Sequence, residues 1–244
     1  MIVHDLVVYG RSSMALATWR QHALSRSRSR SSIVLTLGDT GTLAFGHPHR
    51  LDFGPARRLT PEGPQITLAA PKLAATGGDV LVAWQRTYPR SRDGVWIGGR
   101  LRNGRSMRPR RLGPHGGEPF LSLAPDGSGL LAWRRGRRIL ARLRTPHGRW
   151  GPVETAMTGE PWGLVEGVSL VGDAQRFTIG VVQTHRTSLD VRVRASVHVR
   201  VPGAGWRAAV LGDAGYSPPM QTAFMPNELK ILPLITSEGR IQVA

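Results

Sequence analysis

The strongest constraint on the fold of this 244-residue chain is a segment that recurs about every 50 residues. Three apolar segments, "SMALATWRQ", "DVLVAWQR" and "SGLLAWRR", end on Trp19, Trp84 and Trp133, and a polar residue follows each tryptophan. Two further segments, "RFTIGVVQT" and "ELKILPLIT", place Val182 and Leu234 at the tryptophan position. A fixed period of this length is typical of chains built from copies of one small structural unit.

A second pattern repeats in phase with the first. The segments "FGPARRLTPEGP", "MRPRRLGPHGGEP", "WGPVETAMTGEP" and "GWRAAVLGDAGYSP" each combine a bulky residue, a short strand-like run and a turn rich in Gly and Pro. Three more strand-like segments lie between these landmarks: "GVWIGGRLRNG", "RRILARLRTPHG" and "LDVRVRASVHVRV". One period therefore contains four short strands, which is typical of a β-propeller blade.

We therefore predict an all-β fold, a single β-propeller domain of about five four-stranded blade units over residues 1–244. The approximate units are 1–63, 64–117, 118–160, 161–217 and 218–244. The first interval is longer than the others and contains "QHALSRSRSRSS", so residues 21–32 are predicted to be an Arg/Ser-rich loop insertion.

The last unit is predicted to be incomplete. It supplies strand-like segments at 220–224, 230–236 and 240–244, and then the sequence ends before a fourth. This predicts an open ring, from a fragment or a frayed last blade. The unpaired edge strand would expose backbone donors and acceptors, which favours self-association.

A tight turn is predicted at Pro125, Asp126 and Gly127, because Asp and Gly tolerate the backbone angles that such turns need. The turn would join the first two strands of the third unit. It resembles the Pro-Asp-Gly turns of TolB-like propellers, and the wider pattern "P…LA-DG-G-LLAW…R-L-R…G-W" resembles the repeats of bacterial sialidase-like and lectin-like propellers. The resemblance covers nearly the whole chain, rests on the blade pattern and implies a propeller fold.

Resemblance to sialidases raises the expectation of a glycoside-processing enzyme. Those enzymes use an arginine cluster, a Tyr–Glu pair and a further acidic residue. The segments nearest to their Asp-box, "TLGDTGTLAF" and "SLAPDGSGLLAW", carry extra residues, and the three tyrosines lie in no recognisable motif. The acids that such a site could use are Asp126, Glu118, Glu160 and Glu166. No residue is predicted to be catalytic, because a fold alone does not supply a site.

The formal charge of +17 results from 33 basic and 16 acidic residues, and almost all the basic residues are arginine. Guanidinium groups bind phosphate, sulfate and carboxylate, so a polyanion partner is one hypothesis, although a GC-rich genome also produces many arginines. Arginine alternates along the predicted third strands, at Arg100 and Arg102, Arg142 and Arg144, and Arg192 and Arg194. Alternate residues share one face. We favour a solvated face, and a charged ledge between blades is the other interpretation.

The tryptophans fall into two groups. Those at repeat positions are predicted to pack between blades: Trp19, Trp84, Trp133, Trp150 and Trp206. Trp96 and Trp162 lie outside the repeat and are candidates for exposed residues that stack on a ligand. The candidate ligand-binding residues are therefore Trp96, Trp162, Arg142, Arg144, Arg192 and Arg194.

Other chemistry finds little support in the sequence. The chain has no cysteine, and His47 and His49 offer two imidazoles without a third ligand, so no metal site is predicted. No cofactor is predicted, because there is no P-loop, dinucleotide-binding fingerprint or Gly-x-Ser-x-Gly motif. No secretory leader is predicted from the opening residues, and no apolar run approaches the roughly 18 residues that a membrane span needs. An extracellular or cell-envelope location would follow if the N-terminus were truncated.

The sequence favours a non-catalytic binding or scaffolding propeller that presents loops to a glycan or a protein partner. Two alternatives stay open. One is a sialidase-like glycoside hydrolase, and the other is a polyanion-binding protein that uses its Arg-rich strands.

Overall fold

The structure is a computed structural model of the chain. It describes residues 2–9, 13–25, 28–39, 52–53, 55–60, 63–64, 67–68, 71–76, 78–87, 93–114, 116–158, 164–172, 176–186, 191–201, 203–216, 233–235 and 241–243. All the secondary structure of these residues is β-strand, in 21 strands, so the all-β prediction is confirmed. Nothing in the described part of the chain is a helix long and apolar enough to cross a membrane.

Sheet A comes from the N-terminal part of the chain. Its main strands are β1 (Ile2–Tyr9), β2 (Ser13–Ser25) and β3 (Arg28–Asp39), and the two-residue strands β4 (Asp52–Phe53), β5 (Arg57–Arg58) and β6 (Gly63–Pro64) pair with β3. Residues 21–25 and 28–32, where the sequence suggested a loop insertion, instead continue β2 and β3 as a paired hairpin. Polar side chains do not prevent this, because the antiparallel pairing is made by backbone groups.

Three further sheets follow in sequence order. Sheet B contains β7 (Thr67–Leu68), β8 (Lys72–Thr76), β9 (Asp79–Thr87), β10 (Gly94–Arg100) and β11 (Ser106–Pro114). Sheet C contains β12 (Pro119–Leu123), β13 (Gly129–Arg135), β14 (Arg138–Arg144) and β15 (Glu154–Met157). Sheet D contains β16 (Leu164–Gly172), β17 (Phe177–Arg186), β18 (Val191–Val201) and β19 (Gly205–Tyr216). Sheets C and D each have four antiparallel strands in chain order.

A short pair of strands, β20 (Pro233–Ile235) and β21 (Ile241–Val243), forms sheet E. These strands lie within the second and third strands predicted for the last unit. The predicted first strand, 220–224, lies outside the described residues.

The turn predicted at Pro125 to Gly127 is confirmed. It joins β12 to β13, and the Gly127 N–H donates to the carbonyl oxygen of Ala124 at 2.9 Å. Gly127 has a φ of 87°, which a side chain would disfavour. Asp126 accepts hydrogen bonds from both the backbone N–H and the hydroxyl of Ser128, so this aspartate stabilises the turn.

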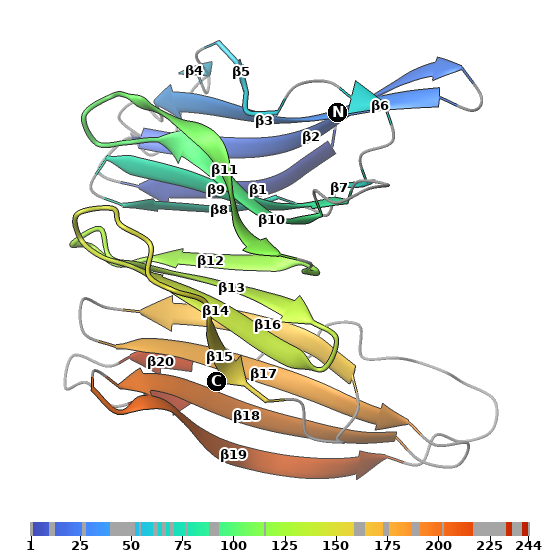
Figure 1. Ribbon diagram of the computed structural model, residues 1–244, viewed down its shortest axis with the longest axis vertical. Coiled ribbons are helices and arrows are strands. Elements are labelled where there is room, and N and C mark those ends of the chain that lie inside the picture. Colours follow the sequence, from blue (N-terminus) through green and yellow to red (C-terminus); the bar gives the residue numbers. More distant parts are fainter. Residues whose placement is uncertain are drawn as a thin grey trace, which may run out of the picture.

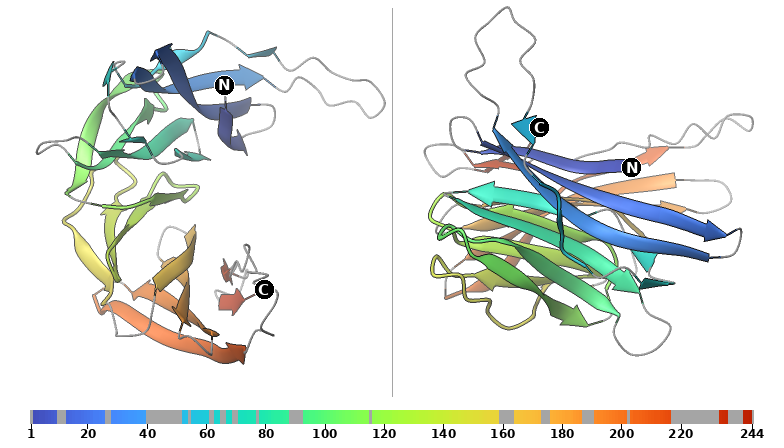
Figure 2. Two further views of the ribbon diagram at one scale, coloured as in Figure 1. Left: turned by 90° about the vertical axis from the view of Figure 1, so that its right-hand side faces the viewer. Right: turned by 90° about the horizontal axis from the view of Figure 1, so that it is seen from above.

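The sheets follow one another along an open arc (Figure 2, left), and Figure 1 shows them stacked from sheet A to sheet D. The first full-length strands of neighbouring sheets contact one another, β1 with β8, β8 with β12 and β12 with β16; the two-residue strand β7 precedes β8 in sheet B. The core therefore divides into layers between sheets instead of forming one central mass.

Each layer is apolar and includes residues of two adjacent sheets. Trp84 of sheet B packs with Ile33 and Leu35 of sheet A, and Trp133 of sheet C packs with Leu81 and other residues of sheet B. Both tryptophan side chains are fully buried, which confirms that they pack between sheets. Gly113 and Gly116 make room for Trp133, because a Cβ on either glycine would lie less than 3 Å from its ring. Trp19, the first tryptophan of the repeat, lies on β2, but its side chain is not among those that the structure describes.

Candidate functional site

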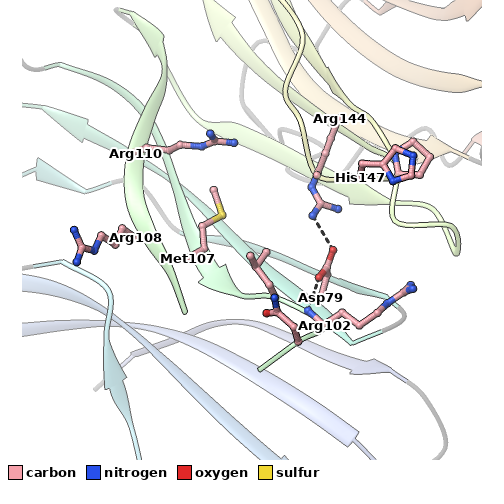
Figure 3. Close-up of a pocket in the computed structure, with 11 residues that line it drawn as sticks. Asp79, Arg102, Met107, Arg108, Arg110, Arg144 and His147 are labelled. Atoms are coloured by element: carbon pink, nitrogen blue, oxygen red, sulfur yellow. Dashed lines mark hydrogen bonds and ion pairs between the residues drawn. The ribbon is translucent and has the colours of Figure 1, made fainter. Parts of the chain in front are cut away.

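A cavity of about 580 Å³ between sheets B and C gathers several charged side chains. Its charged lining residues are Asp79, Arg102, Arg108, Arg110 and Arg144, and His147 lies beside them. They come from the start of β9, the β10–β11 turn, β11, the end of β14 and the turn after it (Figure 3). Leu101, Met107 and Pro146 supply apolar wall.

Arg144 is the buried anchor of this cavity. Its Nη2 lies 2.7 Å from Oδ2 of Asp79, and the two side chains are only 4% and 12% exposed. Its Nη1 donates to the carbonyl oxygen of Gly127. Asp79 also accepts a hydrogen bond from the Arg102 N–H, at 2.6 Å from nitrogen to Oδ1. The Asp79 carboxylate therefore connects β9 and the β10–β11 turn to β14, the third strand of sheet C.

Arg142, two residues earlier on β14, is held by carbonyl oxygens instead. Its Nε donates to the carbonyl of Gly151 at 2.7 Å, and its Nη1 donates to the carbonyl of Leu112 on β11 at 2.8 Å. Carbonyl oxygens fix the guanidinium but do not neutralise it. Within the described residues Arg142 makes no ion pair, so its positive charge adds to that of the cavity.

Arg110 on β11 completes the cationic group. Its guanidinium points toward Arg144 across the cavity, whereas that of Arg108 points away (Figure 3). Partial burial lowers the pKa of Arg110, and repulsion from Arg142 and Arg144 lowers it further. Arg110 makes no ion pair with any described residue. The three guanidinium groups of Arg110, Arg142 and Arg144 therefore share one nearby carboxylate, that of Asp79.

This arrangement is suited to binding an anion. Arginine forms charge-assisted, often bidentate hydrogen bonds with phosphate, sulfate or carboxylate, and an anion beside Arg110 would offset the repulsion among the guanidinium groups. Among the described residues no group of three His, Asp or Glu side chains could hold a metal ion. His47 and His49 lie outside those residues.

Of the arginines nominated from the sequence, the structure brings together Arg142 and Arg144. The favoured interpretation, that their face is solvated, is wrong: Arg144 is buried and Arg142 is half-buried. The face that they share points toward sheet B. There the backbone carbonyl of Leu112 accepts a hydrogen bond from Arg142, and the carboxylate of Asp79 accepts one from Arg144. Arg192 and Arg194 lie instead on β18 of sheet D, where Arg192 is exposed and Arg194 is half-buried.

Trp96 is half-buried and not exposed as expected. It stands directly opposite Trp84 in the β9–β10 register, so both side chains lie on the same face, and it packs against the core between sheets A and B. The Arg86 guanidinium carbon lies 5.3 Å from the centre of its ring. Trp162 lies outside the described residues.

Two residues of the cavity were not nominated from the sequence. Asp79 is the first residue of β9, in "GGDVLVAW", and the next repeat has Ser128 at the same position, so an acid at this repeat position was a usable signal. Arg110 lies in "MRPRRLGP", a run with many charges and no periodicity that singles out one of them. Only the packing of sheet C against sheet B identifies it.

The acids considered for a glycosidase site have other roles where the structure describes them. Glu118 is exposed and forms an ion pair with Lys72 at 2.9 Å. Asp126 stabilises its own turn. Glu160 lies outside the described residues, and Glu166 lies on β16 in a stretch whose side chains are not described.

Comparison with known proteins assigns no family. No protein-family model matches the sequence, and no curated protein matches it significantly. The function is therefore argued from the site alone.

Proposed function

We propose that this protein is a non-catalytic binding protein of the propeller type, whose ligand is a polyanion bound at the cavity between sheets B and C. The observation that carries the proposal is the group of three guanidinium groups, those of Arg110, Arg142 and Arg144, with a single carboxylate among them. A ligand with closely spaced sulfate or phosphate groups fits this chemistry.

The propeller assignment is supported by the arrangement of the sheets. Sheets C and D are four-stranded antiparallel units in chain order, and the first strands of neighbouring sheets lie against one another along the arc. In a propeller these first strands would line the centre, and sheet E would begin a fifth, incomplete unit. The blade pattern that resembles lectin-like, sialidase-like and TolB-like propellers agrees with this proposal.

Electrostatics favour an anion over a neutral partner at this site. Burial lowers the pKa of Arg110, and the charges of Arg142 and Arg144 lower it further, so its protonated form is disfavoured at this place. Arg144 already has Asp79, and Arg142 is fixed by carbonyl oxygens, so Arg110 has the most to gain from an added negative charge. A ligand anion at Arg110 would act where the local repulsion is greatest.

The test compares two arginine variants of equal charge change. Arg110→Gln removes an exposed guanidinium that lines the cavity, and Arg137→Gln removes another exposed one in the β13–β14 turn, at the opposite end of sheet C from Arg144. Binding of a heparin oligosaccharide and of a short DNA duplex is measured at two salt concentrations. We expect Arg110→Gln to weaken binding of the preferred probe about tenfold and to reduce the salt slope by about one, because one charge contact is lost.

Arg137→Gln should leave affinity within about twofold of the parent, because it changes only the diffuse field of the molecule. Equal losses in the two variants would show that the +17 charge acts as a whole and that the cavity is not the site. The better of the two probes would distinguish a sulfated glycan from a nucleic acid. Binding of a neutral glycan that does not respond to salt would support a lectin-like protein instead.

A further inference from the structure

The fourth strand of sheet D is a long, exposed edge. The strands of this sheet are in the order β16, β17, β18, β19, and no described strand pairs with the other side of β19. β19 has 12 residues, and every residue from Arg207 to Gly212 is exposed. The exposed large apolar side chains of the described residues are Val153, Val210 and Leu211, and the last two lie on β19. An edge strand presents unpaired backbone N–H and C=O groups, so another strand can add here.

The fourth strands of sheets B and C offer no such edge. β11 contains Pro109, which has no N–H to donate, and the exposed residues Arg108, Arg110 and Arg111. β15 has only four residues. Proline, charge and short length are features that keep edge strands from pairing with other chains. β19 contains no proline, and the only charge among its described side chains is that of Arg207.

Leu211 occupies a position that is buried in the two preceding sheets. A shift in strand register leaves one residue of each fourth strand without an opposite residue: Leu112 in β11, Ala156 in β15 and Leu211 in β19. Leu112 and Ala156 are 6% and 5% exposed, and each packs in a core that includes residues of the next sheet. Leu211 is 45% exposed. The repeat therefore leaves an apolar side chain largely uncovered at this edge of sheet D.

The exposed apolar side chains lie on both faces of the edge. Val210 lines the cavity between sheets C and D, yet it is 58% exposed. Leu211 corresponds to residues that pack against the following sheet, so it belongs to the opposite face. A sheet packed on one face would cover only one of these two side chains. A strand added beside β19 would reach both, because its successive side chains point to opposite faces.

The sequence of β19 favours a second copy of β19 as that added strand. In an antiparallel pair centred on Val210, Val210 lies opposite Val210 of the second copy, Ala209 lies opposite Leu211, and Ala208 lies opposite Gly212. Leu211, the largest of these side chains, thus meets a small one. Two β-branched residues opposite one another form a favourable cross-strand pair. The run from Ala208 to Gly212 contains no charged residue, so no charge is buried in the pair.

The charge of Arg207 selects the antiparallel direction. In the antiparallel pair the two Arg207 residues lie at opposite ends, about 20 Å apart along the strands, at about 3.4 Å per residue. This separation exceeds the screening length of about 8 Å at physiological salt. A parallel pair in register would instead place Arg207 beside Arg207, and like charges directly opposite one another are destabilising.

We propose that the protein forms a symmetric homodimer in which the β19 strands of two copies pair antiparallel about Val210 and join the two D sheets into one continuous sheet. A two-fold contact of this kind uses the same surface on both copies. The proposal does not depend on anion binding between sheets B and C, because no residue that lines that cavity lies on β19.

Salt distinguishes this association from anion binding. Each copy has a formal charge of +17, so two copies repel one another, and added salt screens the repulsion. Dimerisation should therefore become stronger as salt is raised, whereas polyanion binding should become weaker. Sedimentation equilibrium of the full chain, over a series of protein concentrations at two salt concentrations, measures the dissociation constant of the dimer. An association that weakens with salt would depend on charged contacts and would contradict apolar pairing of β19.

Val210→Lys and Leu211→Lys should each weaken dimerisation about tenfold or more, because each places a charge within the apolar run of both copies. Val153→Lys is the matched control, with the same change in charge. Val153 is 42% exposed, lies just before β15 of sheet C, and its replacement should leave the dissociation constant within about twofold of the parent. Loss of dimerisation in Leu211→Lys but not in Val210→Lys would show a partner packed on one face of sheet D, and strand pairing would be wrong.

Cross-linking tests the register of the pair. The chain has no cysteine, so Val210→Cys introduces one thiol in each copy. Residues directly opposite in an antiparallel pair have Cα atoms about 4.5–5.5 Å apart, within the range that a disulfide spans. With oxidised glutathione as the oxidant, Val210→Cys should form a covalent dimer that a reductant reverses, and Val153→Cys should not. A parent protein that stays monomeric at all concentrations, or equal cross-linking of the two variants, would overturn the proposal.

Discussion

The interfaces of sheet C with its two neighbours use the same sequence position in different ways. Arg144 and Arg200 each precede the turn between the third and fourth strands of a sheet, and each reaches a carboxylate of the preceding sheet. Arg144 meets Asp79 in a buried pair, while Arg200 meets Glu154 in a bidentate pair that is about a quarter exposed.

The residues two positions earlier differ between the two interfaces. Arg142 adds an uncompensated charge to the interface of sheets B and C, and His198 occupies the corresponding position at the interface of sheets C and D. Arg110 adds a further cation to the first interface, and Arg194 on β18 lies among the residues that line the cavity at the second. The comparison teaches that the same positions of a repeated scaffold can carry different side chains, so that each pair of neighbouring sheets encloses a cavity with its own lining.

The largest expected effect on stability comes from shortening the buried apolar side chains that pack between two sheets. Trp133→Ala should lower the free energy of unfolding by about 3–5 kcal/mol, because a large cavity remains where the fully buried ring packs between sheets B and C. The corresponding change in sheet D, Val181→Ala, should cost about 2 kcal/mol, since fewer buried groups are removed. Urea unfolding measures both. Similar losses in the two variants would show that the interfaces do not differ in packing as described.

Breaking the buried ion pair is the next largest effect. Arg144→Gln should cost about 3 kcal/mol, because Asp79 keeps its charge in a nearly buried position without its partner. Arg138→Gln, at an exposed position at the other end of β14, is the control and should change stability by less than about 0.5 kcal/mol. Equal stability of the two variants would mean that the Arg144–Asp79 pair does not join the sheets.

The alternation of arginines along β14 was readable in the sequence, but its environment was not. Period-two alternation correctly places Arg142 and Arg144 on one face. Which face turns toward another sheet depends on Asp79, 65 residues earlier in the chain. A strand with alternating charge has the same pattern whether it faces water or a carboxylate, so the sequence favoured the commoner, solvated arrangement.

The tryptophan repeat shows both the strength and the limit of the pattern. Trp84 and Trp133 are buried between sheets, as their periodic positions predict. The same alignment placed Val182 at the tryptophan position of sheet D, but the strand register gives Val181, whose partner Ser196 corresponds to Leu140. A slip of one residue moves a side chain to the other face of the sheet. The identity of apolar residues in a run such as "TIGVVQT" does not fix that register.

The exposed ion pair should respond to pH. The hydrogen bond from Arg200 lowers the pKa of Glu154 below its ordinary value of 4.5, and the Trp206 hydrogen bond adds to this against the opposing effect of burial. Because the folded-state pKa is depressed, the stabilisation is present above 4.5 and is lost as the pH falls through the folded-state value. At neutral pH Glu154→Gln should cost about 1 kcal/mol.

As the pH falls below 4.5 and through the lowered pKa of Glu154, the stability of the parent should approach that of Glu154→Gln, because protonated Glu154 resembles glutamine. Thermal unfolding at a series of pH values measures this convergence. A constant difference between parent and variant across the series would contradict the assignment of the shift to the Arg200 pair.

The smallest expected effect on stability is that of Arg110→Gln. Removing a repelled cation that makes no ion pair with any described residue should leave the free energy of unfolding within about 0.5 kcal/mol of the parent. Its effect should appear in ligand binding instead. A large loss of stability would show that Arg110 is a structural residue and not a ligand-binding one.

The most direct test of an anion site between sheets B and C is a crystal structure with a heparin-derived tetrasaccharide. A sulfate group should lie within hydrogen-bond distance of the Arg110 guanidinium, on the side that faces Arg144, with the Arg144–Asp79 ion pair intact. Sulfate groups bound only to arginines outside this cavity, with Arg110 making no contact to the ligand, would contradict the proposed function.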